Sequence, residues 1–292
     1  MKEYAIYSAI VGGYDDIKQP LVIDDRFDYI LFSNDIPSSR VGIWQVLPIP
    51  YANEDKTRIA RYVKTHPEQL LAAYKASIWM DGTLQIATPY IYRKFDELEK
   101  DGVLLSSVKH LARECLYEEM VAVLGCLFET EEVILRWGKQ LRKEGFPRYQ
   151  GLTETNVLYR RHQDGRVKAF DSLWWSCINQ FSKRDQLSFN YCAWKLNIDV
   201  PSILPKGECA AYSKEFVYQE HANDKKKYVQ LKTPFMHHWM KKNGASDKDI
   251  TDVYYKLFAL PRPQIWTLLV GQYYRYKYLT AYYIKRILKK SN

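Results

Sequence analysis

The alternation of short apolar runs with amphipathic segments constrains the fold of this chain more than any other feature. Apolar runs bounded by turn residues predict strands at 4–11, 27–35, 43–49, 76–80 and 102–108. Helical spacing of apolar residues predicts helices at 54–66, 89–101, 111–128 and 130–145. The first helix has a candidate N-cap in Asn53, and the second has Pro89 in its first turn. Strands that alternate with helices predict an α/β fold with a mixed, mainly parallel sheet flanked by helices.

Polar or turn-forming residues follow several of these predicted strands. They are Gly12, Gly13, Tyr14, Asp15, Asp35, Asp81, Lys109 and His110. Ligands of such sheets bind beyond the carboxyl ends of the strands, so we expect these residues to meet at one edge. The strand at 76–80 ends at a single acid, Asp81, which is followed by Gly82 and Thr83.

The composition is that of a globular protein, since 47% of the 292 residues are hydrophobic. The formal net charge of +9 suits an anionic partner such as nucleic acid, a nucleotide-linked substrate or an anionic lipid. No signature of a nucleic-acid-binding module appears, so we expect no nucleic-acid partner. The five cysteines are scattered and never spaced as CxxC, which favours neither a disulfide framework nor a zinc knuckle and fits a reducing cytoplasm.

The last quarter of the chain differs from the rest. After about residue 222, a lysine-rich connection leads to 264–290, where apolar residues recur at helical steps beside Tyr, Trp, Lys and Arg. We predict an α/β domain over 1–222 and a basic, aromatic helical extension over 223–292. Such a helix suits a membrane interface, and packing on its own domain is the alternative. No segment resembles a signal peptide or a membrane span, so we expect a cytoplasmic protein, peripheral on the inner face of the cell membrane.

Five segments taken together resemble one known family. They are AIVGGYD, FDYILFSND, KTRIARYVKTHPEQLLAAYKASIWMDGTLQI, KHLARECLYEE and FSKRDQLSFNY, in that order. The set is similar to the glycosyltransferase-like family formerly called domain of unknown function 616, which includes plant mucilage-related and turgor-regulation proteins. The resemblance runs from about Tyr4 to Leu204. It implies the GT-A fold of glycosyltransferases, which is Rossmann-like, and a nucleotide sugar as donor.

The resemblance implies that the nucleotide lies against the first two strand ends and the first helix. Backbone groups of the loop after the first strand would hold the base. These loop residues are Val11, Gly12, Gly13 and Tyr14. Asp35 would contact the ribose or the base, and Arg58, Arg61 and Lys64 share a helix face that can approach one anionic ligand. The alternatives are a tight turn for the loop and a solvated basic face for the helix.

The lone acid after the buried strand is a candidate metal ligand. Enzymes of this fold place an Asp-any-Asp element there, whose carboxylates meet the ribose and a divalent metal on the diphosphate. Mn or Mg suits such hard oxygen ligands. Here the element reads Asp81-Gly82-Thr83, so a hydroxyl replaces the second acid, and His221 is the candidate third ligand. A simple turn at Asp81 is the alternative.

Two further segments are candidates for contact with phosphate or sugar. Lys109, His110 and Arg113 lie near the start of a predicted helix, whose unpaired amides favour phosphate. Glu154 and Asn156 lie on one side of a predicted alternating strand and are candidates for contact with the acceptor or the donor sugar.

The pair Asp185-Gln186 resembles the Asp-Gln pair that lies beside the anomeric carbon in retaining hexosyltransferases of the glycogenin-like type. Asp185 would bind sugar hydroxyls or stabilise positive charge, and Gln186 would lie opposite the leaving diphosphate. In an inverting enzyme the same acid would be the base that deprotonates the acceptor hydroxyl. The structural alternative is an N-cap, because Asp185 precedes a helical pattern.

The resemblance and these residues together imply a hexosyltransferase that uses a nucleotide sugar, such as a UDP-hexose. Its acceptor would be a glycan or a lipid-linked glycan in bacterial surface polysaccharide synthesis, such as capsule or O-antigen, and retention is the favoured stereochemistry. Two other classes stay open. One is a lipid hydrolase of the ceramide type, although the chain has no nucleophile elbow and no HExxH motif. The other is a non-catalytic module that binds glycan or nucleotide.

Overall fold

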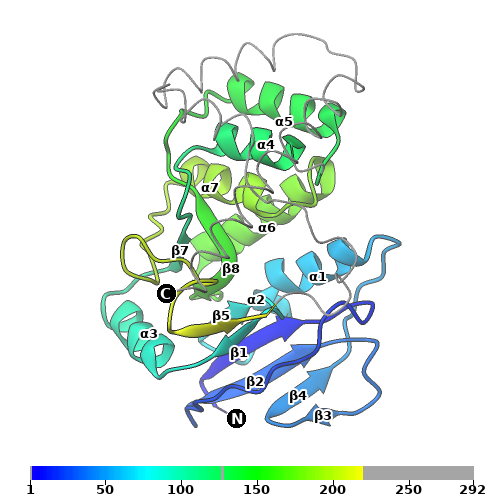
Figure 1. The fold of residues 1–292 in the computed structure, drawn as a ribbon, viewed down its shortest axis with the longest axis vertical. Coiled ribbons are helices and arrows are strands. Elements are labelled where there is room, and N and C mark those ends of the chain that lie inside the picture. The colour runs from blue at the N-terminus through cyan, green and yellow to red at the C-terminus, as the bar shows by residue number, and fades with distance from the viewer. Residues whose placement is uncertain (1, 126–127, 220–292) are drawn as a thin grey trace, which may run out of the picture. The chain divides into compact units, whose positions relative to one another are not determined.

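The computed structural model describes residues 2–125 and 128–219 (Figure 1). Among them, one compact unit runs to Ala112 and resumes at Gly151, and a second unit spans Arg113–Gln150. No helix of the described residues is long and apolar enough to cross a membrane. The domain boundary predicted at residue 222 and the segment 264–290 lie outside the described residues.

The first unit is built on a seven-stranded sheet with the strand order β3-β4-β2-β1-β5-β8-β7. The strands are β1 (Tyr4–Ala9), β2 (Phe27–Phe32), β3 (Arg40–Val41), β4 (Trp44–Leu47), β5 (Ala76–Met80), β7 (Leu105–Lys109) and β8 (Thr153–Arg160). β1 pairs in parallel with β2 and β5, and β2 pairs in parallel with β4. β8 is antiparallel to both β5 and β7. The start of β8 therefore lies at the same edge as the ends of β5 and β7, which confirms the predicted mixed, mainly parallel sheet of the GT-A type.

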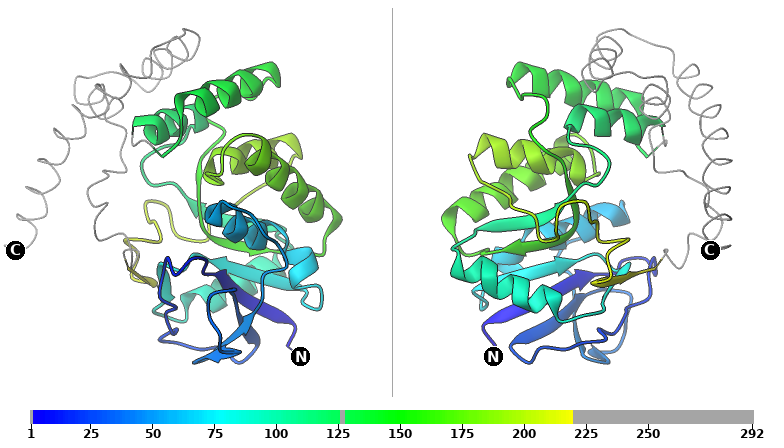
Figure 2. Two further views of the ribbon diagram at one scale, coloured as in Figure 1. Left: turned by 90° about the vertical axis from the view of Figure 1, so that its right-hand side faces the viewer. Right: turned by 60° about the vertical axis from the view of Figure 1, so that its left-hand side comes forward.

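Helices cover both faces of this sheet (Figure 2). They are α1 (Lys56–Thr65), α2 (Pro67–Leu70), α3 (Tyr90–Lys100), α6 (Gly165–Gln180) and α7 (Gln186–Lys195). On one face, Phe95 of α3 joins a buried cluster with Ile6 of β1 and Ile78 of β5. The next residues along these strands, Tyr7 and Trp79, point to the opposite face, which α1, α6 and α7 cover. A two-stranded sheet of β6 (Leu84–Ile86) and β9 (Phe216–Tyr218) completes the unit.

The first helix begins two residues later than the spacing predicts. Its N-cap is Asp55, whose Oδ1 accepts a hydrogen bond from the Thr57 amide at 3.0 Å. Asn53 instead accepts from the Asp55 amide at 2.8 Å, so it stabilises the turn before the cap. Asp55 Oδ2 also lies 2.9 Å from Lys183 Nζ, which ties the start of α1 to the loop before α7. The prediction of Asn53 as N-cap was wrong because the better-placed carboxylate takes that role.

The second unit contains α4 (Leu116–Gly125) and α5 (Glu131–Lys143). The predicted helix at 111–128 begins five residues too early, because the Cys115 carbonyl is the first to accept from amides of α4, those of Glu118 and Glu119. Arg113 lies before the helix, and its Nε is 2.6 Å from the Glu119 carboxylate in a buried ion pair. α5 begins after an N-cap at Thr130, close to the prediction.

Candidate functional site

Asp81 lies directly after β5, at the carboxyl edge of the sheet. Its amide donates to the Asn156 carbonyl of the neighbouring strand β8 at 2.9 Å. Its Oδ1 accepts a hydrogen bond from the Trp79 indole at 2.6 Å and lies 3.3 Å from Lys64 Nζ. The side chain remains 31% exposed. Asp81 is therefore held in one orientation and is still open to a ligand.

Lys64 is the most buried charged group of this site, with no exposed surface. Its Nζ lies 2.6 Å from Asp185 Oδ2 and 3.3 Å from Asp81 Oδ1. The rings of Trp79 and Trp174 lie 5.3 and 5.9 Å from the same nitrogen. Burial lowers the pKa of the Lys64 ammonium, and the two carboxylates oppose that shift. The ammonium thus joins two acids that are far apart in the sequence.

Asp185 directly precedes α7 and is 4% exposed. Besides Lys64, its carboxylate accepts a hydrogen bond from the Thr155 hydroxyl at 2.9 Å and lies 3.3 Å from Arg61 Nη2. Burial alone would raise the pKa of Asp185, but Arg61 and Lys64 outweigh it and hold that pKa well below its usual range. Asp185 is the N-cap residue of α7, as the structural alternative predicts, but its carboxylate makes no capping hydrogen bond and contacts the cations instead.

These four side chains form what we call the charge cluster: Asp81, Asp185, Lys64 and Arg61. They come from α1, from the residue after β5 and from the residue before α7, so the cluster assembles only when the tertiary fold is complete. Two negative and two positive charges leave the cluster close to neutral. The sequence predicted each of these residues for the site, and the structure brings them together.

A second buried ion pair contacts the backbone of Lys64, and the sequence did not predict it. Arg160 of β8 donates from Nη2 to the Lys64 carbonyl at 2.5 Å and to the Tyr7 hydroxyl. Its Nη1 lies 2.6 Å from Asp171 Oδ1, and neither Arg160 nor Asp171 is exposed. Arg160 thus fixes the backbone that carries Lys64. The available signal was a charged residue at the end of the apolar run VLYR.

The loop after β1 adopts the tight turn that its glycines predict. It holds the predicted residues Val11, Gly12, Gly13 and Tyr14. Gly12 and Gly13 have φ of +73° and +59°, in the left-handed region, and a Cβ on Gly12 would lie 2.5 Å from Lys56 Cδ. The Gly12 amide donates to Asp35, and Tyr14 is 43% exposed. Asp35 therefore links the ends of β1 and β2 and is itself exposed.

Gly82 brings the β1 loop close to the end of β5. A Cβ on Gly82 would lie 3.3 Å from Asp15 Oδ2, which shows how closely that carboxylate approaches. Thr83 is 8% exposed, and its carbonyl accepts from the Gln219 amide at 2.9 Å. A carboxylate of the β1 loop therefore lies close to the backbone of Gly82.

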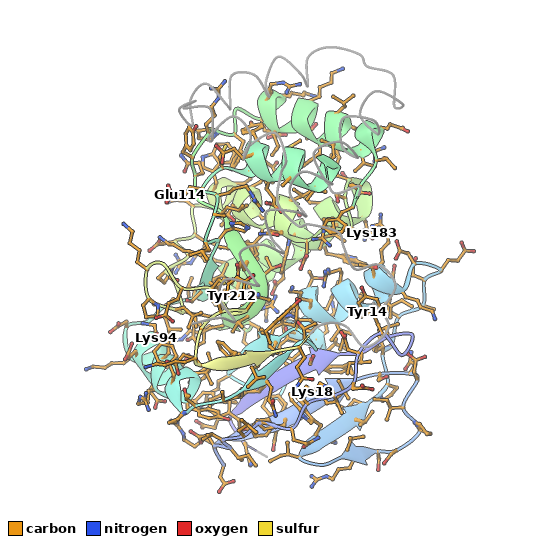
Figure 3. The ribbon with its side chains drawn as sticks, in the orientation of Figure 1. Tyr14, Lys18, Lys94, Glu114, Lys183 and Tyr212 are labelled. Atoms are coloured by element: carbon orange, nitrogen blue, oxygen red, sulfur yellow. The ribbon has the colours of Figure 1, made fainter. Side chains whose placement is uncertain are left out.

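Glu154 and Asn156 lie side by side on β8, as the alternation predicts. Asn156 Nδ2 donates to Glu154 Oε2 at 3.2 Å, and the Ala210 amide lies 3.4 Å from the same oxygen. Two residues further along the loop, Tyr212 is 82% exposed (Figure 3). The loop that contacts Glu154 therefore also carries an exposed aromatic ring.

Other predicted residues have local partners. Arg58 donates to the Ile178 carbonyl of α6. Lys109 is exposed at the end of β7, and the next residue, His110, accepts from the Ala112 amide through Nδ1 at 3.1 Å.

Three further predicted residues are not members of the charge cluster. Arg113 belongs to the second unit, where it pairs with Glu119. Gln186 is half-buried in the first turn of α7. His221 lies outside the described residues.

The described donors around Asp81 do not fit a divalent cation. Within residues 2–125 and 128–219, no group of three or more His, Cys, Asp or Glu side chains could hold a metal ion. Asp81 Oδ1 already contacts an ammonium and an indole, and both oxygens of Asp185 have cationic partners. Three or more oxygen or nitrogen ligands and a net negative charge would suit Mn or Mg.

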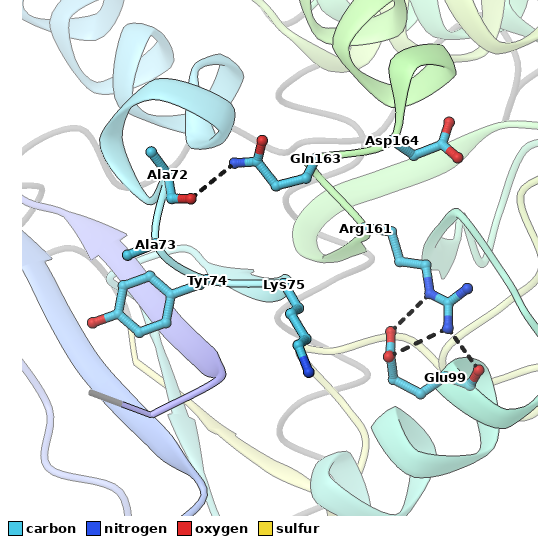
Figure 4. Close-up of a pocket in the computed structure, with 8 residues that line it drawn as sticks. All are labelled: Ala72, Ala73, Tyr74, Lys75, Glu99, Arg161, Gln163 and Asp164. Atoms are coloured by element: carbon cyan, nitrogen blue, oxygen red, sulfur yellow. Dashed lines mark hydrogen bonds and ion pairs between the residues drawn. The ribbon is translucent and has the colours of Figure 1, made fainter.

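A cavity of about 450 Å³ lies elsewhere on the first unit (Figure 4). Its lining residues are Ala72, Ala73, Tyr74, Lys75, Glu99, Arg161, Gln163 and Asp164. Except for Glu99, which lies on α3, these residues precede β5 or follow β8, so the cavity lies at the opposite edge of the sheet from Asp81. An ion pair between Arg161 and Glu99 at 3.0 Å closes one side of it. This cavity is therefore separate from the charge cluster.

Comparison with known proteins assigns the domain. No curated protein matches the chain. The family model of the TOD1/MUCI70, glycosyltransferase-like domain matches residues 1–217, which include the whole sheet and the charge cluster. The match and the mixed α/β sheet agree with the resemblance seen in the sequence motifs. The chain belongs to the TOD1/MUCI70 glycosyltransferase-like family.

Proposed function

We propose that this protein transfers a hexosyl group from a nucleotide sugar, such as a UDP-hexose, to a hydroxyl group of a glycan or lipid-linked glycan. The observation that carries the proposal is the charge cluster at the carboxyl edge of β5, next to the glycine loop after β1. Ligands of open α/β sheets bind at this edge. The glycosyltransferase-like family of the domain supports the same reaction class.

The nucleotide would lie on the glycine loop. At Gly13 the space that a Cβ would take is open, so a base would approach the backbone closely there. Tyr14, 43% exposed, offers a ring for stacking on the base. The open carboxylate of Asp81 would accept hydrogen bonds from the ribose or the donor sugar.

The departing diphosphate would be stabilised by cationic side chains, of which Arg61 is held in place by Asp185. Arg61 is 17% exposed and is oriented by Asp185 at 3.3 Å. Lys56 lies over Gly12, and Lys109 is exposed at the end of β7. Positive groups that are held in place before the reaction stabilise a developing negative charge without reorganisation.

Retention of configuration is the stereochemistry that the Asp185-Gln186 pair favours by resemblance. The bond from the anomeric carbon to the diphosphate oxygen breaks, and a bond to the acceptor oxygen forms on the same face. The acceptor proton passes to the departing diphosphate. Asp185 would orient Arg61 and Lys64, since it is 4% exposed, while Gln186 would face the sugar. The anomeric configuration of the product, read by NMR, tests this assignment.

Nucleotide binding is the first test. At 1 mM, a nucleoside diphosphate or nucleotide sugar with a Kd of about 10 µM adds about 2.7 kcal/mol to stability. We expect the best ligand of a panel to raise the Tm by roughly 5–10 °C. Release of free sugar from the same donor, followed by chromatography, reports the slow hydrolysis that transferases show without acceptor. If no nucleotide or nucleotide sugar changes the Tm, the proposal is wrong.

Tyr212 is the residue that we assign to the acceptor. Its ring is 82% exposed and available for stacking on a sugar, and it belongs to the loop whose Ala210 amide lies 3.4 Å from Glu154. Tyr212→Ala is expected to raise the KM for a glycan acceptor about tenfold, or about 1.4 kcal/mol, with donor hydrolysis unchanged. Tyr212→Phe keeps the ring and serves as the matched control. Equal acceptor KM values in all three proteins would remove Tyr212 from the acceptor site.

Bacterial surface polysaccharide synthesis, such as that of capsule or O-antigen, is the setting that we propose. The support is the basic, aromatic composition of 264–290, which suits the inner surface of a cell membrane. Sedimentation of the full chain with anionic phosphatidylglycerol vesicles tests the membrane association, and we expect the chain to sediment with them. If it sediments no more with these vesicles than with neutral vesicles or without vesicles, the proposed association is wrong.

A further inference from the structure

The position of Lys64 bears on whether this site uses a metal ion at all. A divalent cation bound through Asp81 Oδ1 would lie about 2.0–2.6 Å from that oxygen. The Lys64 ammonium is already 3.3 Å from the same oxygen, and the Trp79 indole donates to it at 2.6 Å. A metal ion there would meet a like charge at close range.

Lys64 cannot move aside without disrupting its surroundings. Its side chain has no exposed surface and lies between the rings of Trp79 and Trp174. Arg160 holds its carbonyl at 2.5 Å. Displacement of the ammonium would also remove the 2.6 Å partner of Asp185, a carboxylate that is itself buried.

The charge balance of the site points the same way. Asp81 and Asp185 are already offset by Lys64 and Arg61, which leaves no uncompensated carboxylate charge in the cluster for Mg or Mn, ions that bind through one or two carboxylates and substrate phosphates. Thr83, in the place of the second acid of the Asp-any-Asp element, is only 8% exposed.

We propose that Lys64 takes the place of the divalent cation beside Asp81, so that this protein binds its nucleotide sugar and transfers the sugar without a metal ion. The inference rests on the proposed transferase function and makes it more specific. In it, Lys64 is a positioning residue that neutralises and orients the two acids. The charge of the diphosphate is met by side chains nearer the surface, chiefly Arg61 and Lys56.

The competing arrangement is a metal ion between Asp81 and Asp15. Asp15 Oδ2 lies 3.3 Å from the position of a Cβ on Gly82, so this carboxylate approaches the end of β5 from the β1 loop. Such a site would use Asp81 Oδ2 and would need the Lys64 ammonium to tolerate a second cation nearby. Asp15→Asn and Asp81→Asn distinguish it from the proposal.

The experiment uses the full chain stripped of metals with EDTA and then compared in EDTA and in 1 mM Mn. The shift in Tm caused by UDP and by UDP-hexoses is expected to be equal in the two buffers, with Kd values within about twofold. A nucleotide Kd that improves tenfold or more with Mn would overturn the inference and leave the transferase function standing. If no nucleotide binds in either buffer, the proposed transferase function is wrong. Direct titration of Mn then tests separately whether the protein binds a divalent cation.

Direct titration of Mn, followed by the electron paramagnetic resonance signal of the free ion, needs no nucleotide. We expect the wild-type chain to show no saturable site. A site that is present in the wild type and lost in both Asp81→Asn and Asp15→Asn would establish the competing arrangement and overturn the proposal.

Lys64→Met tests the role of the ammonium itself. Methionine fills a similar volume, and its substitution leaves two neighbouring carboxylates with one cation fewer. The folded variant is expected to bind Mn where the wild type does not. A folded Lys64→Met that binds no Mn would contradict the assignment to Lys64. The measurements on the wild type decide the question should this variant not fold.

Discussion

Asp81→Asn is expected to lower kcat about 10²- to 10³-fold with little change in Tm. Asparagine keeps an oxygen that can accept the Trp79 indole hydrogen bond, now 2.6 Å long, so the local structure is preserved. It removes the only charge of the cluster that is substantially exposed, 31% of whose side chain is open to a ligand. Steady-state transfer with a nucleotide sugar and a glycan acceptor, beside a thermal melt, measures both quantities.

Asp96→Asn is the matched control for this variant. Asp96 is also a paired carboxylate, 2.6 Å from Arg26, but it lies on α3, on the other face of the sheet. Its replacement should change kcat less than twofold. Full turnover by Asp81→Asn would exclude Asp81 from the site, and an equal loss in both variants would indicate a general effect of charge.

The edge of the sheet at which the site lies follows from the sequence. Strands alternate with helices, and polar residues follow the strands, so the topology alone brings Gly12, Asp35 and Asp81 to one edge. The antiparallel direction of β8 did not follow from the pattern, because an alternating run has no direction. It is this reversal that brings the start of β8, with Glu154 and Asn156, next to Asp81.

The helical periodicity of α1 could not predict what its basic face contacts. Spacing correctly put Arg58, Arg61 and Lys64 on one face, but it could not say whether that face meets solvent, ligand or protein. In the structure this face packs against the protein. Lys64 is fully buried, Arg61 pairs with Asp185, and Arg58 donates to the Ile178 carbonyl. The contact of Lys64 with a nucleotide stays a prediction, and its burial favours an indirect role.

The same limit explains the missed pair of Arg160 and Asp171. A charged residue such as Arg160 at the end of an apolar run can mark the end of a strand or can have a buried partner, and the sequence does not decide between them. Its partner, Asp171, lies on a helix that the sequence motifs did not cover. Only the packing of α6 on β8 makes the two ends of the pair meet. Buried charges of this kind are found from structure because their cause is tertiary.

Arg160→Met is expected to destabilise the protein by about 3–5 kcal/mol, or roughly 6–20 °C in Tm. The variant leaves Asp171 buried without its cation and releases the hydrogen bonds to Tyr7 and to the Lys64 carbonyl. Activity should fall further than stability predicts, because the backbone of Lys64 loses its anchor. Thermal melts and kinetics at a temperature where the variant is folded separate the two effects.

The pH dependence of this loss identifies its cause. In the wild type, burial raises the pKa of Asp171 to about 7, against the opposing effect of Arg160. Without Arg160 that pKa rises further. At pH 5 the Asp171 carboxyl is then protonated and buried in its neutral form. At pH 8 it is either buried with its charge or takes up a proton, and both lower the free energy of unfolding. The Tm difference from the wild type should therefore be smaller at pH 5 than at pH 8.

The double variant Arg160→Met/Asp171→Leu should recover most of the lost stability, because it removes both charges of the pair. Arg160 Nε and Asp171 Oδ2 have no hydrogen-bond partner among the described residues, so the removal of these two atoms leaves no further buried polar group unpaired. A loss of stability equal to that of Arg160→Met alone would contradict this account.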